Sequence, residues 1–141
     1  MKIYHWVCVP ILALSLIVGC SQDKVIPLGT GLIGAYYGNS DFTNIKDAEI
    51  LTSLDKVWNE ETGHGNTWSG QWEGYLIAPV TGDVTLTLVS NKEASLNLGE
   101  NISIHTDEES TEASTVISMK KGESYPIKIG YTHAGGGTGT L

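Results

Sequence analysis

The sequence of 141 residues contains no arginine, although it has eight lysines and sixteen acidic residues. Arginine is the side chain that most readily forms paired hydrogen bonds to phosphates and to base edges. The formal net charge of the chain is −8 at pH 7, and an acidic surface is repelled by a phosphate backbone. The composition therefore excludes nucleic acid as a partner.

Cysteine is nearly absent, because only Cys8 and Cys20 occur and both lie near the N-terminus. The apolar run Val7–Val18 follows Lys2, which is typical of a signal peptide and too short for a comfortable membrane span. The run ends in Ile-Val-Gly-Cys, which resembles a lipobox with Cys20 as the lipidated residue. The alternative is an ordinary secretory signal in which this cysteine occurs by chance.

The expected organisation is a lipoprotein signal peptide at 1–19, a lipidated tether at 20–30 and one domain at 31–141. Several acyl chains on Cys20 would anchor the protein to a membrane, because a single chain binds only marginally. A mature chain whose only cysteine is lipidated has no disulfide and no cysteine metal site. We expect a location in the cell envelope, at the outer membrane or the cell surface.

Short runs of alternating apolar and polar residues predict β-strands along most of the domain. The expected strands are Gln71–Ala78, Val84–Val89, Ser95–Leu98, Ile102–His105, Val116–Met119 and Tyr125–Tyr131. Short strands at this spacing indicate a sandwich or a barrel. One segment, Asp47–Trp58, also has apolar residues at helical spacing and is equally compatible with a helix.

Three blocks of sequence occur in an order typical of one family. They are Gly31–Phe42, which contains Gly-Ala-Tyr-Tyr-Gly; Trp72–Gly82, with a tryptophan, a glycine, an aromatic, a proline and a Thr-Gly turn; and Lys121–Tyr131, followed by three glycines. Together they span nearly all of residues 31–141 and resemble the protective-antigen (PA14) domain family. The resemblance implies an all-β, antiparallel β-sandwich, and it favours extended structure for Asp47–Trp58.

The resemblance also places most aromatic residues in the core. We expect Tyr36, Trp72, Tyr125 and Tyr131 to be buried. The glycines beside the central aromatics, at positions 70 and 74, would let the rings of Trp72 and Tyr75 pack closely over the backbone.

In the sugar-binding adhesins of this family, two adjacent aspartates on a loop hold a calcium ion that contacts sugar hydroxyls. The matching stretch here is Ser90-Asn91-Lys92-Glu93. Both aspartates are missing, and the ammonium of Lys92 stands where a cation would bind. A later Asp-Gly of the family is matched by Gly99-Glu100, which lacks the aspartate too. Because calcium requires several oxygen ligands, we expect no calcium and no other cofactor.

The sequence shows no pattern of a catalytic site. The histidines at 64, 105 and 133 are scattered and form no ligand-spaced pair. Glu60 and Glu61 are adjacent in a loop, so they cannot readily face each other across a glycosidic bond. No nucleophile elbow or phosphate loop is present. We predict that this chain is not an enzyme; whether a longer parent protein is a hydrolase stays open.

The segment Asn59–Gly70 is predicted to be a long loop that offers both chemistries a sugar needs. The candidate ligand-binding residues are Glu61, His64, Asn66 and Trp68. Indole rings stack on the apolar faces of sugars, and amide and carboxylate groups bind their hydroxyls. We expect Trp58 to close the end of the sandwich, whereas for Trp68 core packing and sugar contact are equally compatible with the sequence.

These observations predict a non-catalytic, surface-anchored carbohydrate-binding or substrate-targeting module, the N-terminal part of a glycan-processing lipoprotein. Its partners would be an oligosaccharide or polysaccharide and, through the lipid, a membrane. The alternative is a structural or protein-interaction module without a sugar site. Because the chain stops at Leu141, soon after the glycine run, we also expect a truncated last strand and a longer reading frame.

Overall fold

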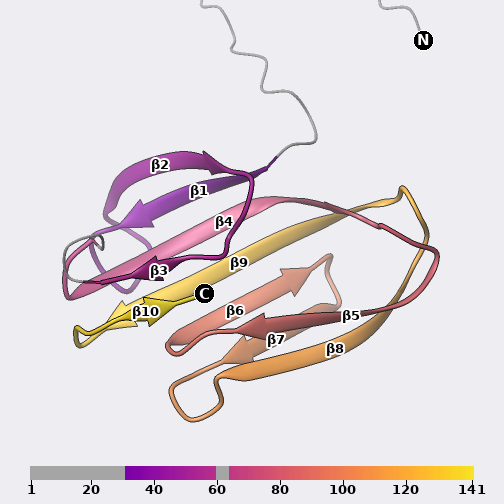
Figure 1. Cartoon of the computed structure of the whole chain (residues 1–141). Coiled ribbons are helices and arrows are strands. Elements are labelled where there is room, and N and C mark those ends of the chain that lie inside the picture. The colour runs from indigo at the N-terminus through magenta and orange to yellow at the C-terminus, as the bar shows by residue number, and fades with distance from the viewer. Residues whose placement is uncertain (1–30, 60–63) are drawn as a thin grey trace, which may run out of the picture.

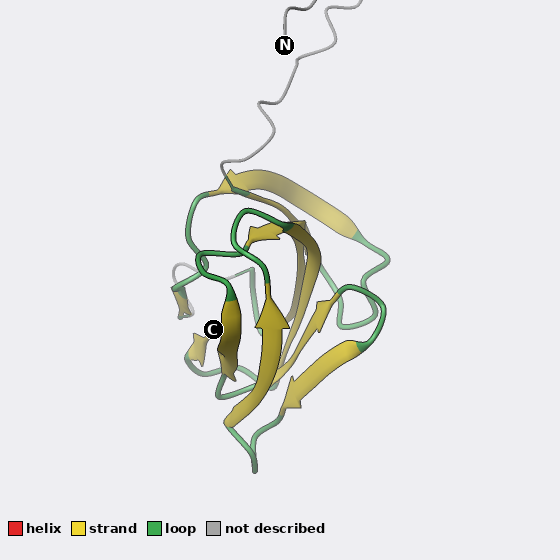
Figure 2. Ribbon diagram, turned by 90° about the vertical axis from the view of Figure 1, so that its right-hand side faces the viewer, coloured by secondary structure: helices red, strands yellow, loops and turns green. Residues whose placement is uncertain are grey.

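Side chains that alternate between buried and exposed positions form the strands of this protein, as the two-residue period of a strand requires. The computed structural model describes residues 31–59 and 64–141. Within these ranges the elements are β1 Leu32–Tyr37, β2 Ile45–Leu51, β3 Val57–Trp58, β4 Thr67–Ile77, β5 Gly82–Val89, β6 Glu93–Leu98, β7 Ile102–Thr106, β8 Glu112–Met119, β9 Ser124–Ala134 and β10 Gly139–Thr140. Figure 2 shows strands and loops only in the described chain, and no helix there is long and apolar enough to cross a membrane.

The strands form two layers (Figure 1). One layer is a six-stranded sheet in the order β2-β1-β4-β9-β6-β7, and its neighbours are antiparallel. The other layer consists of two short pairs, β5 with β8 and β3 with β10, which are antiparallel as well. The expected antiparallel β-sandwich is therefore confirmed.

The six strands expected from alternation are all present, most of them longer than expected. The segment Asp47–Trp58 is extended, as the family resemblance implied, because β2 pairs with β1 and β3 pairs with β10. Its apolar residues at helical spacing are divided between two strands and the connection between them. Pairing with neighbouring strands thus overrides a local pattern that a helix would also satisfy.

The core lies between the two layers and is dominated by aromatic rings. Trp72 and Tyr131 are fully buried, Tyr36 is 3% exposed, and Tyr125 packs partly buried against the core. The aliphatic part of the core is Leu51, Leu88, Leu96, Leu98, Ile104, Ile117, Met119 and Ile129, with Ala78 and Ala94. All four tyrosine and tryptophan residues expected inside the sandwich therefore contact its core.

The expectation for the two glycines of β4 is half correct. A Cβ at Gly70 would collide with the ring of Trp72, so this glycine does make room for the indole. A Cβ at Gly74 would instead lie 2.8 Å from Cδ2 of Leu32. Tyr75 does not pack over the backbone, because its side chain points to the outer face of the sheet and is 61% exposed.

The predicted loop Asn59–Gly70 is wrong in its last four residues. Thr67–Gly70 belong to β4 and pair with β9, starting with Thr67 opposite Ala134. β4 begins this early because its partner β9 extends to Ala134 and supplies the hydrogen bonds. Trp68, Ser69 and Gly70 are buried in succession, so this part of the strand lacks the alternation that would have identified it.

The connections β1–β2, β5–β6, β7–β8 and β9–β10 all lie at one end of the sandwich, on the left in Figure 1. The chain enters β1 at the end of that strand that points away from these connections. Residues far apart in the sequence, around positions 91, 108 and 135, are thereby brought together at one end of the molecule.

Candidate functional site

A cleft of about 730 Å³ opens at the end of the sandwich where the connections gather. We name it the loop-end cleft. It is lined by Lys92, Glu93, His105, Asp107, Glu108, Glu109, Thr132, Ala134 and Gly135. These residues come from the β5–β6 turn, the end of β7, the β7–β8 loop and the end of β9, so four parts of the fold build one site.

The β5–β6 turn is held by the hydroxyl of Ser90, which is fully buried. Its Oγ donates to the carbonyl of Lys92 at 2.9 Å and accepts from the amide of the same residue at 3.2 Å. The amide of Ser90 donates to the carbonyl of Thr111 at 2.9 Å, which ties this turn to the β7–β8 loop. A serine that bonds the backbone two residues on is a common turn device, and here it fixes the position of Lys92.

Asp107 shapes the β7–β8 loop in a similar way. Its Oδ1 accepts hydrogen bonds from the amides of Ser110 at 2.7 Å and Glu109 at 2.9 Å. These backbone hydrogen bonds stabilise the carboxylate and hold the pKa of Asp107 below its usual value. Asp107 is therefore ionised at neutral pH, and its hydrogen bonds hold the loop at the edge of the cleft.

Lys92 forms the charge pair at the centre of the site. Its Nζ lies 2.6 Å from Oε1 of Glu108, and its side chain is only 16% exposed. The hydrogen bond from Lys92 and the charge of its ammonium lower the pKa of Glu108. Separating a largely buried ammonium from its carboxylate costs free energy, because the charge is left without a partner. This pair therefore fixes the wall of the cleft.

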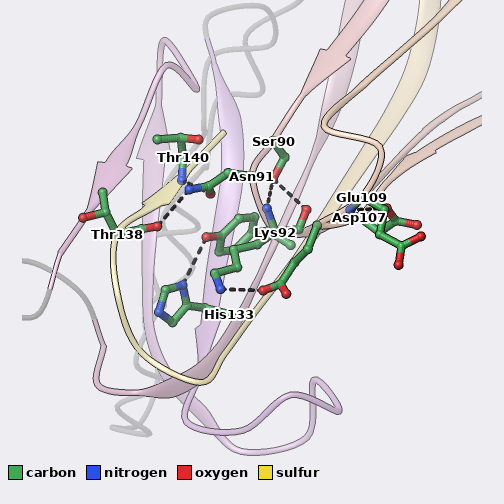
Figure 3. A network of polar contacts seen from close by, with 10 residues as sticks. Ser90, Asn91, Lys92, Asp107, Glu109, His133, Thr138 and Thr140 are labelled. Atoms are coloured by element: carbon green, nitrogen blue, oxygen red, sulfur yellow. Dashed lines mark hydrogen bonds and ion pairs between the residues drawn. The ribbon is translucent and has the colours of Figure 1, made fainter.

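Asn91 joins the β5–β6 turn to the C-terminal strand (Figure 3). Its Nδ2 donates to the carbonyl of Thr138 at 2.9 Å, and its Oδ1 accepts from the amide of Thr140 at 2.9 Å. Both ends of the amide are therefore occupied by the backbone around β10. This residue, at one of the family's aspartate positions, has a structural part in this chain.

Beneath the cleft, Tyr131 and His133 form a buried pair. The hydroxyl of Tyr131 and Nδ1 of His133 are 3.2 Å apart and hydrogen-bonded. Burial raises the pKa of Tyr131 to about 12. The pKa of His133 is lowered, first by burial and then by the charge of Lys92. Both side chains are therefore neutral at neutral pH.

Trp68, the aromatic candidate for sugar contact, lies in the core and is fully buried. Its ring packs against Trp58 at a centroid distance of 5.0 Å and against Tyr131 at 5.1 Å. The sequence was equally compatible with core packing and with sugar contact for Trp68, and its complete burial identifies it as a core residue. The cause is its place in β4, where its side chain points inward.

His64 and Asn66 lie close to this aromatic cluster. His64 is exposed, but its ring lies over Tyr36 at 4.4 Å and beside Trp68 at 5.1 Å. The carbonyl of Asn66 accepts a hydrogen bond of 3.3 Å from the amide of Gly136 in the β9–β10 loop. Neither lines the loop-end cleft. The other two expectations, ligand binding by Glu61 and lipid attachment at Cys20, fall outside the described residues.

The residues at the family's calcium position do not fit a calcium ion. Lys92 and Asn91 are the residues that the family resemblance matches to the two aspartates. The ammonium of Lys92 is paired with Glu108, and both polar atoms of the Asn91 amide are hydrogen-bonded to the backbone of Thr138 and Thr140. No group of three or more potential metal-ligating side chains occurs among residues 31–59 and 64–141. The ammonium of Lys92 therefore supplies positive charge beside the carboxylate of Glu108.

The cleft was not predicted from the sequence, because its residues are spread over separate segments of the chain. The segment 107–112 is rich in acidic residues but contains no binding motif, and the segment 90–93 was predicted only to be a loop without calcium. Neither segment predicts a site alone, and His105 and Thr132 give no signal at all. An antiparallel sandwich places alternate connections at the same end, so combining the expected topology with the loop composition would have indicated this cleft.

The model of the PA14 domain family matches residues 28–141, which are most of the chain. This protein therefore belongs to the PA14 domain family. A search of curated proteins found no match.

Several solved structures have the same fold. An anti-sigma factor domain-containing protein from Clostridium clariflavum is 23% identical with a TM-score of 0.70, and the match covers 94% of this chain and 45% of that one. The epithelial adhesin 9 A domain from Candida glabrata, in complex with Galβ1-3GlcNAc, is 9% identical with a TM-score of 0.67 over 80% of each chain. A β-glucosidase from Kluyveromyces marxianus is 16% identical with a TM-score of 0.60, over 72% of this chain and 14% of that one.

The anti-sigma factor domain-containing protein and a second protein of the same description, 24% identical with a TM-score of 0.70, are much longer than this chain, which spans 45% and 41% of their lengths. At these identities the likeness concerns the fold. The same sandwich thus occurs in an anti-sigma factor domain-containing protein, a β-glucosidase and an adhesin.

Proposed function

We propose that this chain is a non-catalytic carbohydrate-binding module that holds a glycan in the loop-end cleft. The observation that carries the proposal is the cleft itself, whose volume of about 730 Å³ is typical of small-ligand sites. Its carboxylates accept hydrogen bonds from sugar hydroxyls, and its ammonium donates to them. The adhesin domain of similar fold that is bound to Galβ1-3GlcNAc supports this choice of ligand class.

The charge of the lining favours an uncharged glycan. One ammonium, on Lys92, faces four carboxylates, on Glu93, Asp107, Glu108 and Glu109. A cleft with an excess of one sign of charge raises the free energy of a ligand of that same sign. Glycans that carry uronic acid, sulfate or phosphate groups are therefore disfavoured.

Binding is proposed to be independent of calcium, because Lys92, which the family resemblance matches to one of the two calcium-binding aspartates, has an ammonium that is paired with Glu108. The ammonium would contact sugar hydroxyls directly. In the cell, a glycan-binding module on a lipid anchor would hold the polypeptide against polysaccharide in the envelope. On this proposal the chain is the N-terminal part of a glycan-processing lipoprotein; a β-glucosidase of which a similar sandwich forms a small part supports this choice.

The test is an amide NMR titration of the protein with neutral oligosaccharides, with and without EDTA. We expect shifts at Glu93, His105 and Thr132 that EDTA does not alter. Lys92→Met should abolish them. Lys120→Met is the matched control, because Lys120 is also paired with a glutamate, at 3.2 Å, but lies in the β8–β9 turn. Shifts that require added calcium, or that survive Lys92→Met, would contradict the proposal.

One observation favours the alternative function, a protein-interaction module. The lining of the loop-end cleft contains no tryptophan, tyrosine or phenylalanine, although sugars bind well to such rings. Titration spectra that no oligosaccharide changes, together with a protein partner whose binding maps to the same cleft, would establish this alternative.

A further inference from the structure

The outer face of the six-stranded sheet carries a second depression, a groove of about 460 Å³. It is lined by Ile33, Glu73, Gly74, Tyr75, Asn97, Gly99, Pro126, Ile127 and Lys128. All but Gly99, which directly follows β6, come from β1, β4, β9 and β6, and these strands are neighbours in the sheet (Figure 1). None of them lines the loop-end cleft, so the two depressions are separate.

Tyr75 is the notable residue of this groove. Its side chain is 61% exposed, in contrast to the buried tyrosines of the core. Its cross-strand neighbour on β9 is Pro126, whose ring has no backbone donor to offer. Among the described residues its hydroxyl has no hydrogen-bond partner. An open aromatic ring beside a glycine and a proline gives a ligand a flat apolar surface.

Hydrogen-bonding groups form a row next to this ring. Glu73 lies opposite Ile33 on one side and opposite Lys128 on the other, and Lys128 lies opposite Asn97. The carboxylate of Glu73 and the ammonium of Lys128 are 2.9 Å apart, and both side chains are about half exposed. The three hydrogen-bonding side chains, of Glu73, Lys128 and Asn97, lie on three neighbouring strands, so the row spans two inter-strand spacings or roughly 10 Å.

These features restrict the ligand. The single acid and the single base are paired, so the groove is neutral and offers no net attraction to an ion. The exposed apolar surface is interrupted by this ion pair, whereas a stable protein interface buries about 1,200–2,000 Å² with an apolar centre. A flat apolar ring beside a row of donors and acceptors instead matches the two surfaces of a pyranose, which has an apolar C–H face and a rim of hydroxyls.

We propose that this groove is a second binding site for a neutral oligosaccharide, with Tyr75 as the stacking platform and Glu73, Lys128 and Asn97 as hydroxyl-binding groups. The site is independent of the loop-end cleft. Two sites on one domain would let a long polysaccharide be held at two points, which raises its apparent affinity without any new contact.

The experiment is an amide NMR titration with cellohexaose, laminarihexaose, maltohexaose and xylohexaose. At least one of them should shift the amides of Gly74, Tyr75, Gly99 and Lys128. Tyr75→Ala should weaken this binding by about tenfold, in line with the loss of an aromatic contact. Tyr75→Phe keeps the ring and should bind within about twofold of the parent chain.

Two further variants separate the outcomes. Val116→Ala is the matched control, because Val116 is a similarly exposed apolar residue, at 62%, on β8 in the other layer. Lys92→Met should remove the shifts at the loop-end cleft and leave those at the groove. If Tyr75→Ala has no effect while Lys92→Met abolishes all binding, the second site does not exist and the proposed function stands.

The reverse pattern, with loss at Tyr75 only, supports the groove and contradicts the loop-end cleft. If none of the four hexasaccharides shifts the amide signals of the groove residues, the present proposal is overturned. Line broadening that is confined to the groove and grows with protein concentration overturns it too, because a second copy of the chain would then be its occupant.

Discussion

The folded structure changes the environment of His133, because this residue is only 3% exposed and its Nδ1 is hydrogen-bonded to the hydroxyl of Tyr131. Its pKa is lowered by burial and by the charge of Lys92. Since the unfolded chain has the ordinary value near 6.5, it takes up a proton at a higher pH than the folded chain. The stability that depends on a neutral His133 is therefore complete above about pH 6.5 and decreases as the pH falls toward the folded-state pKa.

We expect the free energy of unfolding to decrease between pH 7 and pH 5, and His133→Gln to flatten this dependence. The carboxylates titrate mainly below this window, so they do not obscure it. Urea denaturation at several pH values measures the slope. His105→Gln is the control, because His105 is exposed; an equal change in both variants would show that burial of His133 is not the cause.

At the scale of single residues, the sequence predicted the burial of an aromatic ring where glycines lie beside it. Trp72 was expected in the core, and its indole indeed lies against Gly70 and Gly34, where added Cβ atoms would collide with it. The sequence could not decide the place of Trp68, because a single residue in a run of Thr-Trp-Ser-Gly has no alternation around it. The strand that contains it is determined by the length of its partner β9, which is a non-local property.

β10 is the element that depends most on contacts outside its own sheet. It has two residues and pairs only with β3. The side chain of Asn91 adds hydrogen bonds to the backbone on both sides of Gly139. A two-residue strand is marginal without such support, so this amide adds to the backbone hydrogen bonds between Leu141 and Lys56 in holding the end of the chain.

We expect Asn91→Ala to expose the amide of Thr140 to rapid hydrogen exchange and to destabilise the protein by about 1–2 kcal/mol, the usual effect of leaving backbone groups unpaired. Asn91→Asp keeps the acceptor for that amide and should have a smaller effect on its exchange. Hydrogen exchange followed by mass spectrometry measures both. Unchanged protection in Asn91→Ala would mean that pairing with β3 is sufficient.

At the scale of elements, the alternation of apolar and polar residues predicted correctly where strands occur but not how long they are. Six strands were expected and found, because each has one buried face. β1 and β2 were not expected from alternation; extended structure in their region followed only from the family motifs. The loop-end cleft was missed for a related reason: alternation describes strands, whereas the site is formed by the connections between them.

The whole molecule is expected to be a lipoprotein, and this expectation rests on sequence alone. We predict that the protein is recovered in the membrane fraction and takes up a labelled fatty acid, because several acyl chains give stable anchoring. Cys20→Ser should lose the label and leave the protein unanchored. Retention of label in this variant, or its absence in the parent chain, would show that the N-terminus is an ordinary secretory signal.

The sandwich also separates the residues that stabilise the chain from the residues proposed to recognise ligands. The aromatic core and the long pair of β4 and β9 set the strand register, whereas the loop-end cleft is built largely from turns of a few residues. Such turns tolerate exchange far better than a packed interior does. An adhesin domain with only 9% identity has the same sandwich, so this frame accepts very different sequences. Ligand preference can therefore change through the exchange of a few turn residues without a change of the frame.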